Sequence, residues 1–547
     1  MLLALAAGFF TSNAQEKDLS SIVFNIPVPE TICPSAYSEP LKIEGKSYNF
    51  APVFFIYPDR KVDAAGAAAL VKELGFEDIE GMVVTSFHVI NPQEKEYGQV
   101  DFEVFKELFG GISKVGNLKV IGIGRGATFV NTVIAPQADF CIAGVMSIGG
   151  GSYKLPKGAK HAGTPAYVAG KGAKKAVQAY VSMAGAIPDG NGFVNPGEPL
   201  MKVVANESED LTLAQYFKDA WDSVLGKSYR FNNIGHTFYD GSKFGEYGTY
   251  ELEPYVDWES MGITRKVVTN SPNQLKPEDQ YLWYEYWPNE LMEGAKEHSV
   301  PVLVLLHGNR NDPRAQAETS GFLQVAGEDR FFIVELEWQG NSQFLAMQND
   351  GIENVINTLL RKYPQLDPTR IYAHGLSAGS MTATTLGITK SHVFAAVGGN
   401  NGGSYSDALW AQATQKQGTL TAYCPVAGGA DKVVGVVTPE NYKRAGIYKA
   451  WTLYQHMMEL PVAEELDFNV DPVFGQKLRD RETITLNKGD GITVETGQLY
   501  KGDIPVMKLI SITNYGHGNC PAVARISWDY MKHFSRNRLT GELIYNP

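Results

Sequence analysis

Five consecutive residues, Gly375-Leu376-Ser377-Ala378-Gly379, carry the clearest chemical signal in the sequence. They follow a strand-like run, Arg370–Ala373, and precede a helix-like run that begins at Ala378. A serine on a sharp turn between a strand and a helix is exposed as a nucleophile, and flanking glycines give the strained backbone room. The start of the helix also favours developing negative charge. The pattern predicts that Ser377 is a nucleophile, in preference to an incidental serine in a glycine turn.

A serine nucleophile needs a base, and the base needs a carboxylate to orient it. When a nucleophile stands on such a turn, the acid and then the histidine follow it in chain order. Asp431 ends the turn Gly428-Gly-Ala-Asp, directly after the apolar run Thr421–Val426. This position predicts that Asp431 is the acid at the carboxyl edge of a sheet. Its rivals have no comparable strand before them; they are Asp407, Asp467 and Asp471.

The predicted base is His517, in the glycine-flanked loop Asn514-Tyr-Gly-His-Gly after the strand-like run Val506–Ile512. The helix-like run Ala522–Phe534 follows it and is expected to close the fold. His392 comes too soon after Ser377, while His456 and His533 stand inside helix-like runs.

The negative charge on the attacked carbonyl oxygen needs two preorganised N–H donors. We expect the Ala378 amide, next after the nucleophile, and the Asn309 amide in the loop His307-Gly308-Asn309-Arg310. A plain turn is the alternative for that loop. Trp338 follows another strand end at the same predicted edge, so it is either a wall of the substrate cleft or a packed aromatic.

Strands and helices alternate in two long segments, Ser47–Thr237 and Pro301–Arg536, which predicts mostly parallel sheets with helices on both faces. In the first segment we expect strands at Pro52–Tyr57, Met82–Val89 and Leu118–Ile123, and helices at Asp63–Leu74 and Asp101–Phe109. In the second we expect strands at Pro301–Leu306 and Phe331–Leu336, and helices at Ile352–Arg361 and Ala378–Ile388, with Tyr281–Trp287 as a leading strand.

The two segments look like copies of one another. Matches in the same order pair Gly122-Ile-Gly-Arg-Gly with Gly375-Leu-Ser-Ala-Gly, and Val168-Ala-Gly with Val426-Ala-Gly. Gly124 then stands where Ser377 is, Ala173 opposite Asp431, and Pro58-Asp59 opposite His307-Gly308, so only His236 survives. The first segment is therefore predicted to be a degenerate copy. The spacing Gly122-x-Gly124-x-x-Ala127 also fits a dinucleotide-binding turn, which is the alternative.

Length and charge limit the other possibilities. A chain of 547 residues is long enough for two domains. We predict a signal peptide at 1–15, a degenerate domain at 16–240, a connection with the first strands of the second domain at 241–300, and a catalytic domain at 301–547. The net charge of −12 argues against nucleic acid and anionic membranes as partners, and no stretch after residue 15 is apolar for about 18 residues. Four cysteines have the wrong spacing for a zinc site; Cys424 and Cys520 are either paired or free thiols.

The segments LVLLHGN, RIYAHGLSAGSMTATTLGITKSHVFAAVGGNNGG, CPVAGGADKVV and GHGNCPAVARISWDYMKHF resemble the polyhydroxybutyrate-depolymerase and feruloyl-esterase group of α/β-hydrolases. The resemblance covers nearly all of the second half. It implies a triad of Ser377, Asp431 and His517, no metal or other cofactor, and hydrolysis of carboxylic esters outside the cell. The sequence departs from the group in lacking tryptophan and proline after His517 and in the long insertion Thr438–Asp503, which leaves the substrate in doubt.

These observations predict a secreted or periplasmic serine esterase acting on polyester, feruloyl or acyl-sugar esters. A serine peptidase on the same fold and a non-catalytic binding protein are the alternatives, and the oligomeric state stays open.

Overall fold

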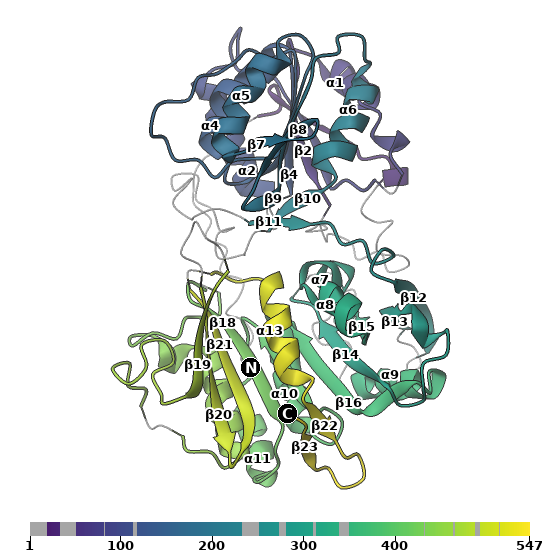
Figure 1. Ribbon diagram of the computed structural model, residues 1–547, viewed down its shortest axis with the longest axis vertical. Helices are drawn as coiled ribbons and strands as arrows, with labels where there is room; N and C mark the ends of the chain where they lie inside the picture. The colour runs from purple at the N-terminus through teal and green to yellow at the C-terminus, as the bar shows by residue number, and fades with distance from the viewer. Residues whose placement is uncertain are drawn as a thin grey trace.

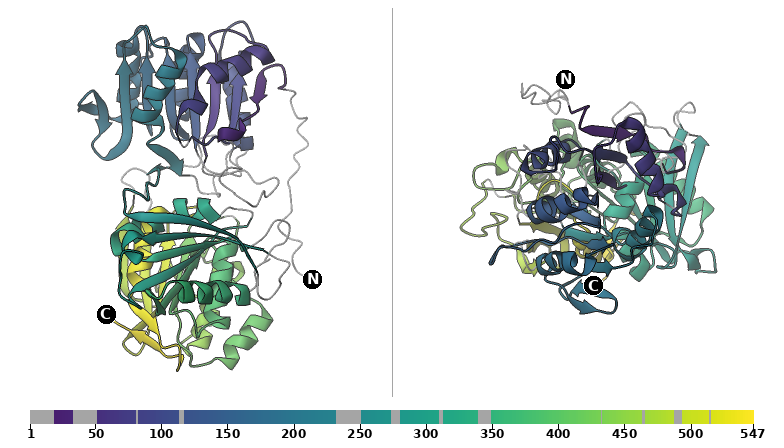
Figure 2. Two further views of the ribbon diagram at one scale, coloured as in Figure 1. Left: turned by 90° about the vertical axis from the view of Figure 1, so that its right-hand side faces the viewer. Right: turned by 90° about the horizontal axis from the view of Figure 1, so that it is seen from above.

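The computed structural model describes residues 19–32, 51–80, 82–112, 117–231, 251–272, 280–309, 313–338, 349–431, 433–462, 465–486, 493–513 and 515–547. These residues form two α/β domains, stacked along the long axis of the molecule (Figures 1 and 2). Each domain has one large, mostly parallel sheet with helices on both faces, as the sequence predicts. The predicted boundary at residue 240 and the predicted signal at 1–15 lie outside the described residues.

The first sheet contains nine described strands, and its order across the sheet is β1-β3-β2-β4-β5-β6-β9-β8-β7. The central pairs from β3 to β9 are parallel, while β1 and the hairpin β7–β8 are antiparallel edges. In chain order the strands are β1 Val23–Ile26, β2 Val53–Tyr57, β3 Ser86–Ile90, β4 Leu118–Ile123, β5 Ile142–Ile148, β6 Ala166–Ala169, β7 Ile187–Asp189, β8 Gly192–Asn195 and β9 Glu198–Asn206.

Two apolar layers cover this sheet. One packs beneath α2, α3, α4 and α5, and the other beneath α1 and α6. The helices are α1 Ala64–Glu73, α2 Gln99–Ile112, α3 Arg125–Phe129, α4 Ala135–Ala138, α5 Ala173–Ala184 and α6 Leu213–Ala220. A short antiparallel ribbon follows, made of β10 Ser228–Phe231 and β11 Glu251–Pro254.

The second sheet contains ten described strands in the order β12-β13-β15-β14-β16-β17-β18-β21-β20-β19. From β15 to β21 the pairs are parallel, and both edges are antiparallel. The strands are β12 Ile263–Pro272, β13 Gln280–Pro288, β14 Val300–Leu306, β15 Phe332–Leu336, β16 Leu366–Gly375, β17 Ala396–Asn400, β18 Ala422–Gly428, β19 Arg479–Thr485, β20 Thr493–Lys501 and β21 Ile504–Ile512.

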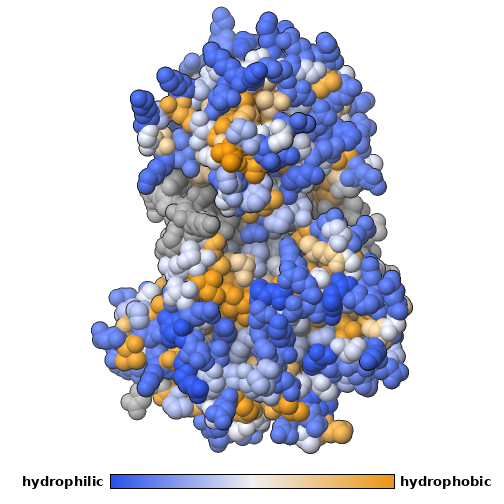
Figure 3. Space-filling model, viewed as in Figure 1, coloured by the Kyte–Doolittle hydropathy of each residue, from blue (hydrophilic) through white to orange (hydrophobic). Residues whose placement is uncertain are grey.

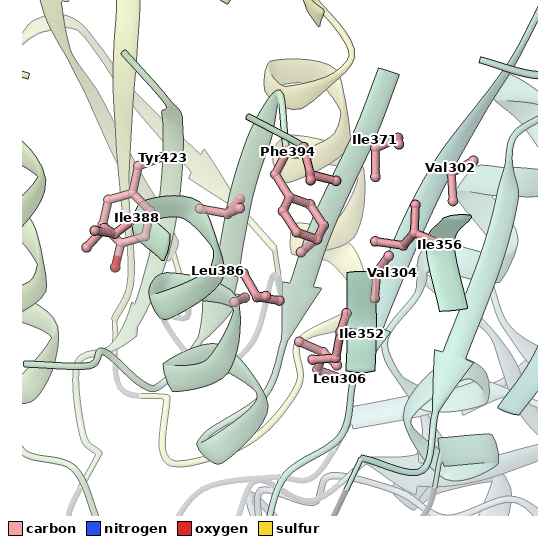
Figure 4. Close-up of a cluster of buried hydrophobic side chains, with 14 of the residues drawn as sticks. Val302, Val304, Leu306, Ile352, Ile356, Ile371, Leu386, Ile388, Phe394 and Tyr423 are labelled. Atoms are coloured by element: carbon pink, nitrogen blue, oxygen red, sulfur yellow. The ribbon is translucent and has the colours of Figure 1, made fainter. Parts of the chain in front are cut away.

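Helices α9 to α12 cover one face of this sheet, and α7, α8 and α13 cover the other. Figure 4 shows the first of these layers, where Val302, Val304 and Leu306 of β14 lie beside Ile352 and Ile356 of α9. The helices are α7 Pro313–Thr319, α8 Phe322–Asp329, α9 Asn349–Lys362, α10 Ala378–Thr389, α11 Asp407–Gln415, α12 Gly446–Met457 and α13 Pro521–Met531, before the hairpin β22 Phe534–Arg536 and β23 Leu543–Tyr545.

The two sheets share one topology. From β3 to β7 in the first sheet and from β15 to β19 in the second, corresponding strands lie in the same order across the sheet. In each sheet an antiparallel strand comes next at this end: β1 pairs with β3, and β13 pairs with β15. The second sheet adds only β12. This correspondence pairs β4 with β16, β5 with β17 and β6 with β18, as the sequence matches predict for a tandem copy.

Candidate active site

Ser377 stands on a tight turn between β16 and α10 with a backbone that few residues adopt. Its φ is 54° and its ψ is −115°. Its amide donates to Asn400 O at 2.9 Å, which fixes the turn against the end of β17. A Cβ on Gly379 would collide with the carbonyl oxygen of Leu306, so β14 approaches the turn too closely for a side chain. The sequence predicts this strained strand–turn–helix, and the structure contains it.

Asp431 and His517 meet at the same carboxyl edge of the sheet, after β18 and β21. His517 Nδ1 lies 2.8 Å from Asp431 Oδ2, and each residue is 2% exposed. The other carboxylate oxygen, Oδ1, accepts the amides of Val433 at 2.8 Å and Val434 at 3.2 Å. These bonds hold the carboxylate in one orientation and leave Nε2 of His517 for a second partner. In the described part of the chain, Ser377 Oγ makes no hydrogen bond.

Asn401 joins the loops that carry these three residues, and its role was not apparent from the sequence. Its side-chain amide donates to Gly516 O at 2.9 Å and to Gly518 O at 3.1 Å, on either side of His517. Its Oδ1 accepts the amide of Gly428 at 2.7 Å, at the end of β18. The residue is 1% exposed and has a φ of 53°. Asn400 before it accepts the Ser377 amide, so this pair links the serine turn to the histidine loop.

The predicted oxyanion donors lie next to the serine turn. Ala378 begins α10, and the first amides of a helix have no partner within it. The loop after β14 passes the turn at Gly308, where a Cβ would lie 3.6 Å from Leu376 O. Asn309 follows and is exposed. The two predicted donors therefore come from adjacent loops at one edge of the sheet.

Trp338 does not form a wall of the cleft, because its side chain is 0% exposed. Its indole N–H donates to His307 O at 3.1 Å, and its ring packs in the core beside α9. His307 Nε2 lies 3.2 Å from Glu337 Oε1. An aromatic after a strand can point either way, and here it turns inward to support the backbone before Asn309.

Three exposed apolar side chains stand close to the predicted triad along the chain, and they were not predicted from the sequence. Met381 lies one turn beyond Ser377 on α10 and Val433 two residues beyond Asp431, while Tyr405 follows β17 on the loop whose Gly402 packs against Ser377. Their exposed fractions are 40%, 47% and 43% in that order. An apolar substrate group could contact these side chains beside the serine.

The first domain repeats the serine turn without its chemistry. Gly124 has a φ of 56° and a ψ of −112°, and its amide donates to Ile148 O at 2.8 Å, as Ser377 does to Asn400. A Cβ on Gly124 would collide with the Asp59 carboxylate, whose Oδ1 accepts the Arg125 amide at 3.0 Å. This shared geometry accounts for the glycine spacing that also fits a dinucleotide-binding turn. His236 lies outside the described residues.

The described residues hold no group of three or more His, Cys, Asp or Glu placed to bind a metal ion. None of their helices is both long and apolar enough to cross a membrane. Cys424 and Cys520 are buried and do not form a disulfide bond with each other, and burial raises the pKa of Cys424 to about 12.

No family model matches the chain, and no curated protein matches its sequence. Solved structures do match in part. An acetyl xylan esterase from Aspergillus awamori is 15% identical over 49% of this chain and 98% of its own, with a TM-score of 0.34. An S-formylglutathione hydrolase from Agrobacterium tumefaciens is 13% identical over 50% and 93%, with a TM-score of 0.32. A feruloyl esterase module from Clostridium thermocellum is 11% identical over 50% and 88%, with a TM-score of 0.31.

The strand order of the second sheet, the helices on both of its faces and the strained serine turn at its carboxyl edge are the features that define the fold. The second half of the chain therefore has the α/β-hydrolase fold, and the first half has a degenerate version of it.

Proposed function

We propose that the second domain hydrolyses carboxylic esters with Ser377, His517 and Asp431 as its triad. The observation that carries the proposal is the buried pair of His517 and Asp431 at 2.8 Å, on the same sheet edge as Ser377 with its φ of 54°. A carboxylate that holds Nδ1 leaves Nε2 as the base, and a strained turn presents the serine. The sequence resemblance favours esters over amides.

In the proposed reaction Ser377 Oγ attacks the ester carbonyl carbon while His517 Nε2 takes the hydroxyl proton. The amides of Ala378 and Asn309 bind the oxyanion. The C–O bond to the alcohol then breaks, and His517 returns the proton to the leaving oxygen. Water, deprotonated by the same nitrogen, attacks the acyl carbon; the bond to Ser377 Oγ then breaks, Oγ takes the proton back from Nε2, and the carboxylic acid leaves. The oxygen of Ser377 must first turn towards His517, a contact that often forms only with substrate.

The three exposed apolar side chains support an apolar acyl or alcohol group as part of the substrate. Met381 and Val433 follow Ser377 and Asp431 closely along the chain, and Tyr405 stands three residues after Gly402, which packs against Ser377. The sequence resemblance leaves polyester, feruloyl and acyl-sugar esters as candidates. The secreted or periplasmic location stays a prediction, because residues 1–15 lie outside the described part.

The test is turnover of nitrophenyl esters of increasing acyl length, methyl ferulate, acetylated xylan and polyester film, together with labelling by a fluorophosphonate. We expect one label per chain, at Ser377, and we expect Ser377→Ala to lose ester turnover by on the order of 10⁶-fold while the fold stays intact. Ser182→Ala, at an exposed serine of α5, is the matched control and keeps full activity.

Two outcomes would overturn the proposal. Turnover of matched amides at rates comparable to esters would identify a peptidase instead. Failure of the probe to label Ser377 in folded protein would favour a binding protein.

A further inference from the structure

The loops of the first domain that correspond to the triad loops carry a different chemistry. In the second domain the loop after β17 packs against Ser377, and the loop after β18 carries Asp431. Their counterparts follow β5 and β6. The loop after β5 packs on the vestigial turn, where Gly151 N donates to Thr128 Oγ1 at 2.8 Å. This edge has kept its shape while losing the serine.

Lysines now occupy these two loops and the helix that follows. Between Asp139 and Asp189 the chain has six lysines and no acidic residue, in a protein with a net charge of −12. All six are exposed, and none forms an ion pair with a residue of the described part. We call them the lysine surface: Lys154, Lys157, Lys160, Lys171, Lys174 and Lys175.

The fold brings the six lysines to one side of the domain. The loop after β5 begins at Gly149, whose amide donates to Ala169 O at the end of β6, just before Lys171. It returns at Gly163, where a Cβ would lie 2.8 Å from Ala184 Cα in the last turn of α5. The loop therefore runs along the helix that carries Lys174 and Lys175. Figure 1 shows α5 on the outside of the domain, and Figure 3 shows hydrophilic residues around an apolar patch on this face of the domain.

Acidic residues also lie at this edge, but in the described part of the chain none of them forms an ion pair with the six lysines. Asp59 and Glu96 are bound to Arg125, after β4. Glu207, Glu209 and Asp210 follow Asn206, the last residue of β9, whose carbonyl accepts the Gly170 amide next to Lys171. The lysines on α5 and on the loop beside it form no ion pairs in the described part of the chain, so their positive charges can attract an anion.

We propose that the lysine surface binds an acidic polysaccharide, a polymer whose carboxylates repeat along the chain. The edge points away from the second domain, because Asn117 at the opposite end of β4 donates to Tyr255 Oη at 2.7 Å, and Tyr255 packs with the second core. Only an extended ligand could touch this surface and the second domain together. Such a ligand would raise the concentration of its ester groups near Ser377.

The observations favour this partner over nucleic acid and lipid. A duplex or membrane surface would also face the remaining negative charge of the protein. Membrane attachment usually needs an apolar anchor, and Leu155, the one large aliphatic side chain of the loop, is half-buried against the first core.

The experiment measures binding of polygalacturonate to the full chain carrying Ser377→Ala, so that the result is independent of ester turnover. We expect affinity that falls as salt rises, because exposed charges are screened. The variant Lys154→Gln, Lys157→Gln, Lys174→Gln, Lys175→Gln should bind about 10- to 100-fold more weakly, since exposed charge pairs each contribute modestly.

A second variant removes the same charge elsewhere, at four exposed lysines: Lys72, Lys227, Lys296 and Lys477. It should bind polygalacturonate as the parent does, and both variants should keep the thermal midpoint of the parent. Equal weakening in both variants would overturn the proposal, as would no binding. Tighter binding to duplex DNA or to phosphatidylserine vesicles would overturn it in favour of those partners.

Discussion

Ser377 combines reactivity with backbone strain, and the two can be separated by mutation. A non-glycine residue at a φ of 54° and a ψ of −115° costs about 1–3 kcal/mol. Glycine adopts this conformation freely, and the equivalent position in the first domain is Gly124, with nearly the same angles.

We therefore predict that Ser377→Gly abolishes ester turnover and stabilises the second domain. The relief of strain exceeds the added freedom of the unfolded chain, which is about 0.5–1 kcal/mol for glycine, so the net gain is about 1 kcal/mol. Ser377→Ala keeps the strain and is the control. Denaturant midpoints of the two inactive variants should differ in favour of Ser377→Gly; an equal or lower midpoint would show that the turn is not strained.

His374, three residues before the serine, is a buried histidine held neutral. Both of its ring nitrogens lack a hydrogen-bond partner within the described part of the chain, and Phe322 packs against the ring. Burial lowers its pKa to about 3, against about 6.5 in the unfolded chain. A proton therefore binds the unfolded state more readily, so the second domain loses stability as the pH falls below about 6.5.

From this we predict that His374→Leu flattens the acid limb of stability. At pH 5 the unfolded histidine is protonated and the folded one is not, which costs about 2 kcal/mol relative to pH 7. Leucine has a similar volume and no charge to bury, so this loss should be absent in the variant. Unfolding free energies at pH 7 and pH 5 test the difference; an unchanged slope between the two proteins would contradict it.

At the scale of the elements, the site depends on how the ends of β17, β18 and β21 are held together. Asn401 does this with three side-chain hydrogen bonds to Gly516, Gly518 and Gly428. Asparagine and glycine tolerate its φ of 53°, so glycine can remove the bonds without adding strain.

Accordingly, we predict that Asn401→Gly lowers kcat by about 10²-fold with a smaller change in KM, since loss of the bonds lets His517 shift relative to Ser377. Asn401→Asp keeps the acceptor for the Gly428 amide but places a carboxylate against the carbonyls of Gly516 and Gly518, so it should also lose activity. A merely structural role would lower stability and leave the kcat and the pH profile of the folded enzyme unchanged.

Buried elements were predictable from the sequence, while exposed ones were not. β14, β15 and the start of α10 lie within about a residue of the predicted bounds, because apolar runs mark strands buried on both faces. β19 was missed because most residues of Arg479–Thr485 are charged and nearly all are exposed. Met82–Val89 was predicted as one strand, but β3 starts at Ser86, since the Val84 amide donates to Ile32 O outside the sheet.

Some residues of the site could be predicted from the sequence, and others could not. Ser377, Asp431 and His517 each follow a strand, so their positions could be read from chain order and local motifs. Asn401 and Trp338 act through partners 115 and 31 positions away, and such contacts leave no local signal. Within the insertion Thr438–Asp503, α12 packs in the core through Trp451, and β19 and β20 extend the sheet.

The whole molecule has two domains with the same tight turn, but only the second domain has a serine on it. The first retains the turn, the amide of Arg125 and the close approach of β2, where a Cβ on Gly126 would collide with Tyr57 O. What it lacks is space, since Asp59 fills the position of the serine side chain, and an acid, since Ala173 stands at the position of Asp431 in the sequence match.

We predict that adding a serine does not restore a second active site. The chain with Ser377→Ala and Gly124→Ser should show no fluorophosphonate label, and its first domain should lose about 1–3 kcal/mol, because the new Cβ overlaps the Asp59 carboxylate. Adding Asp59→Ala removes the overlap and should recover stability without restoring the label, since Ala173 stands where the sequence match places the acid. A label in this last variant would show instead that Asp59 alone had silenced the first domain.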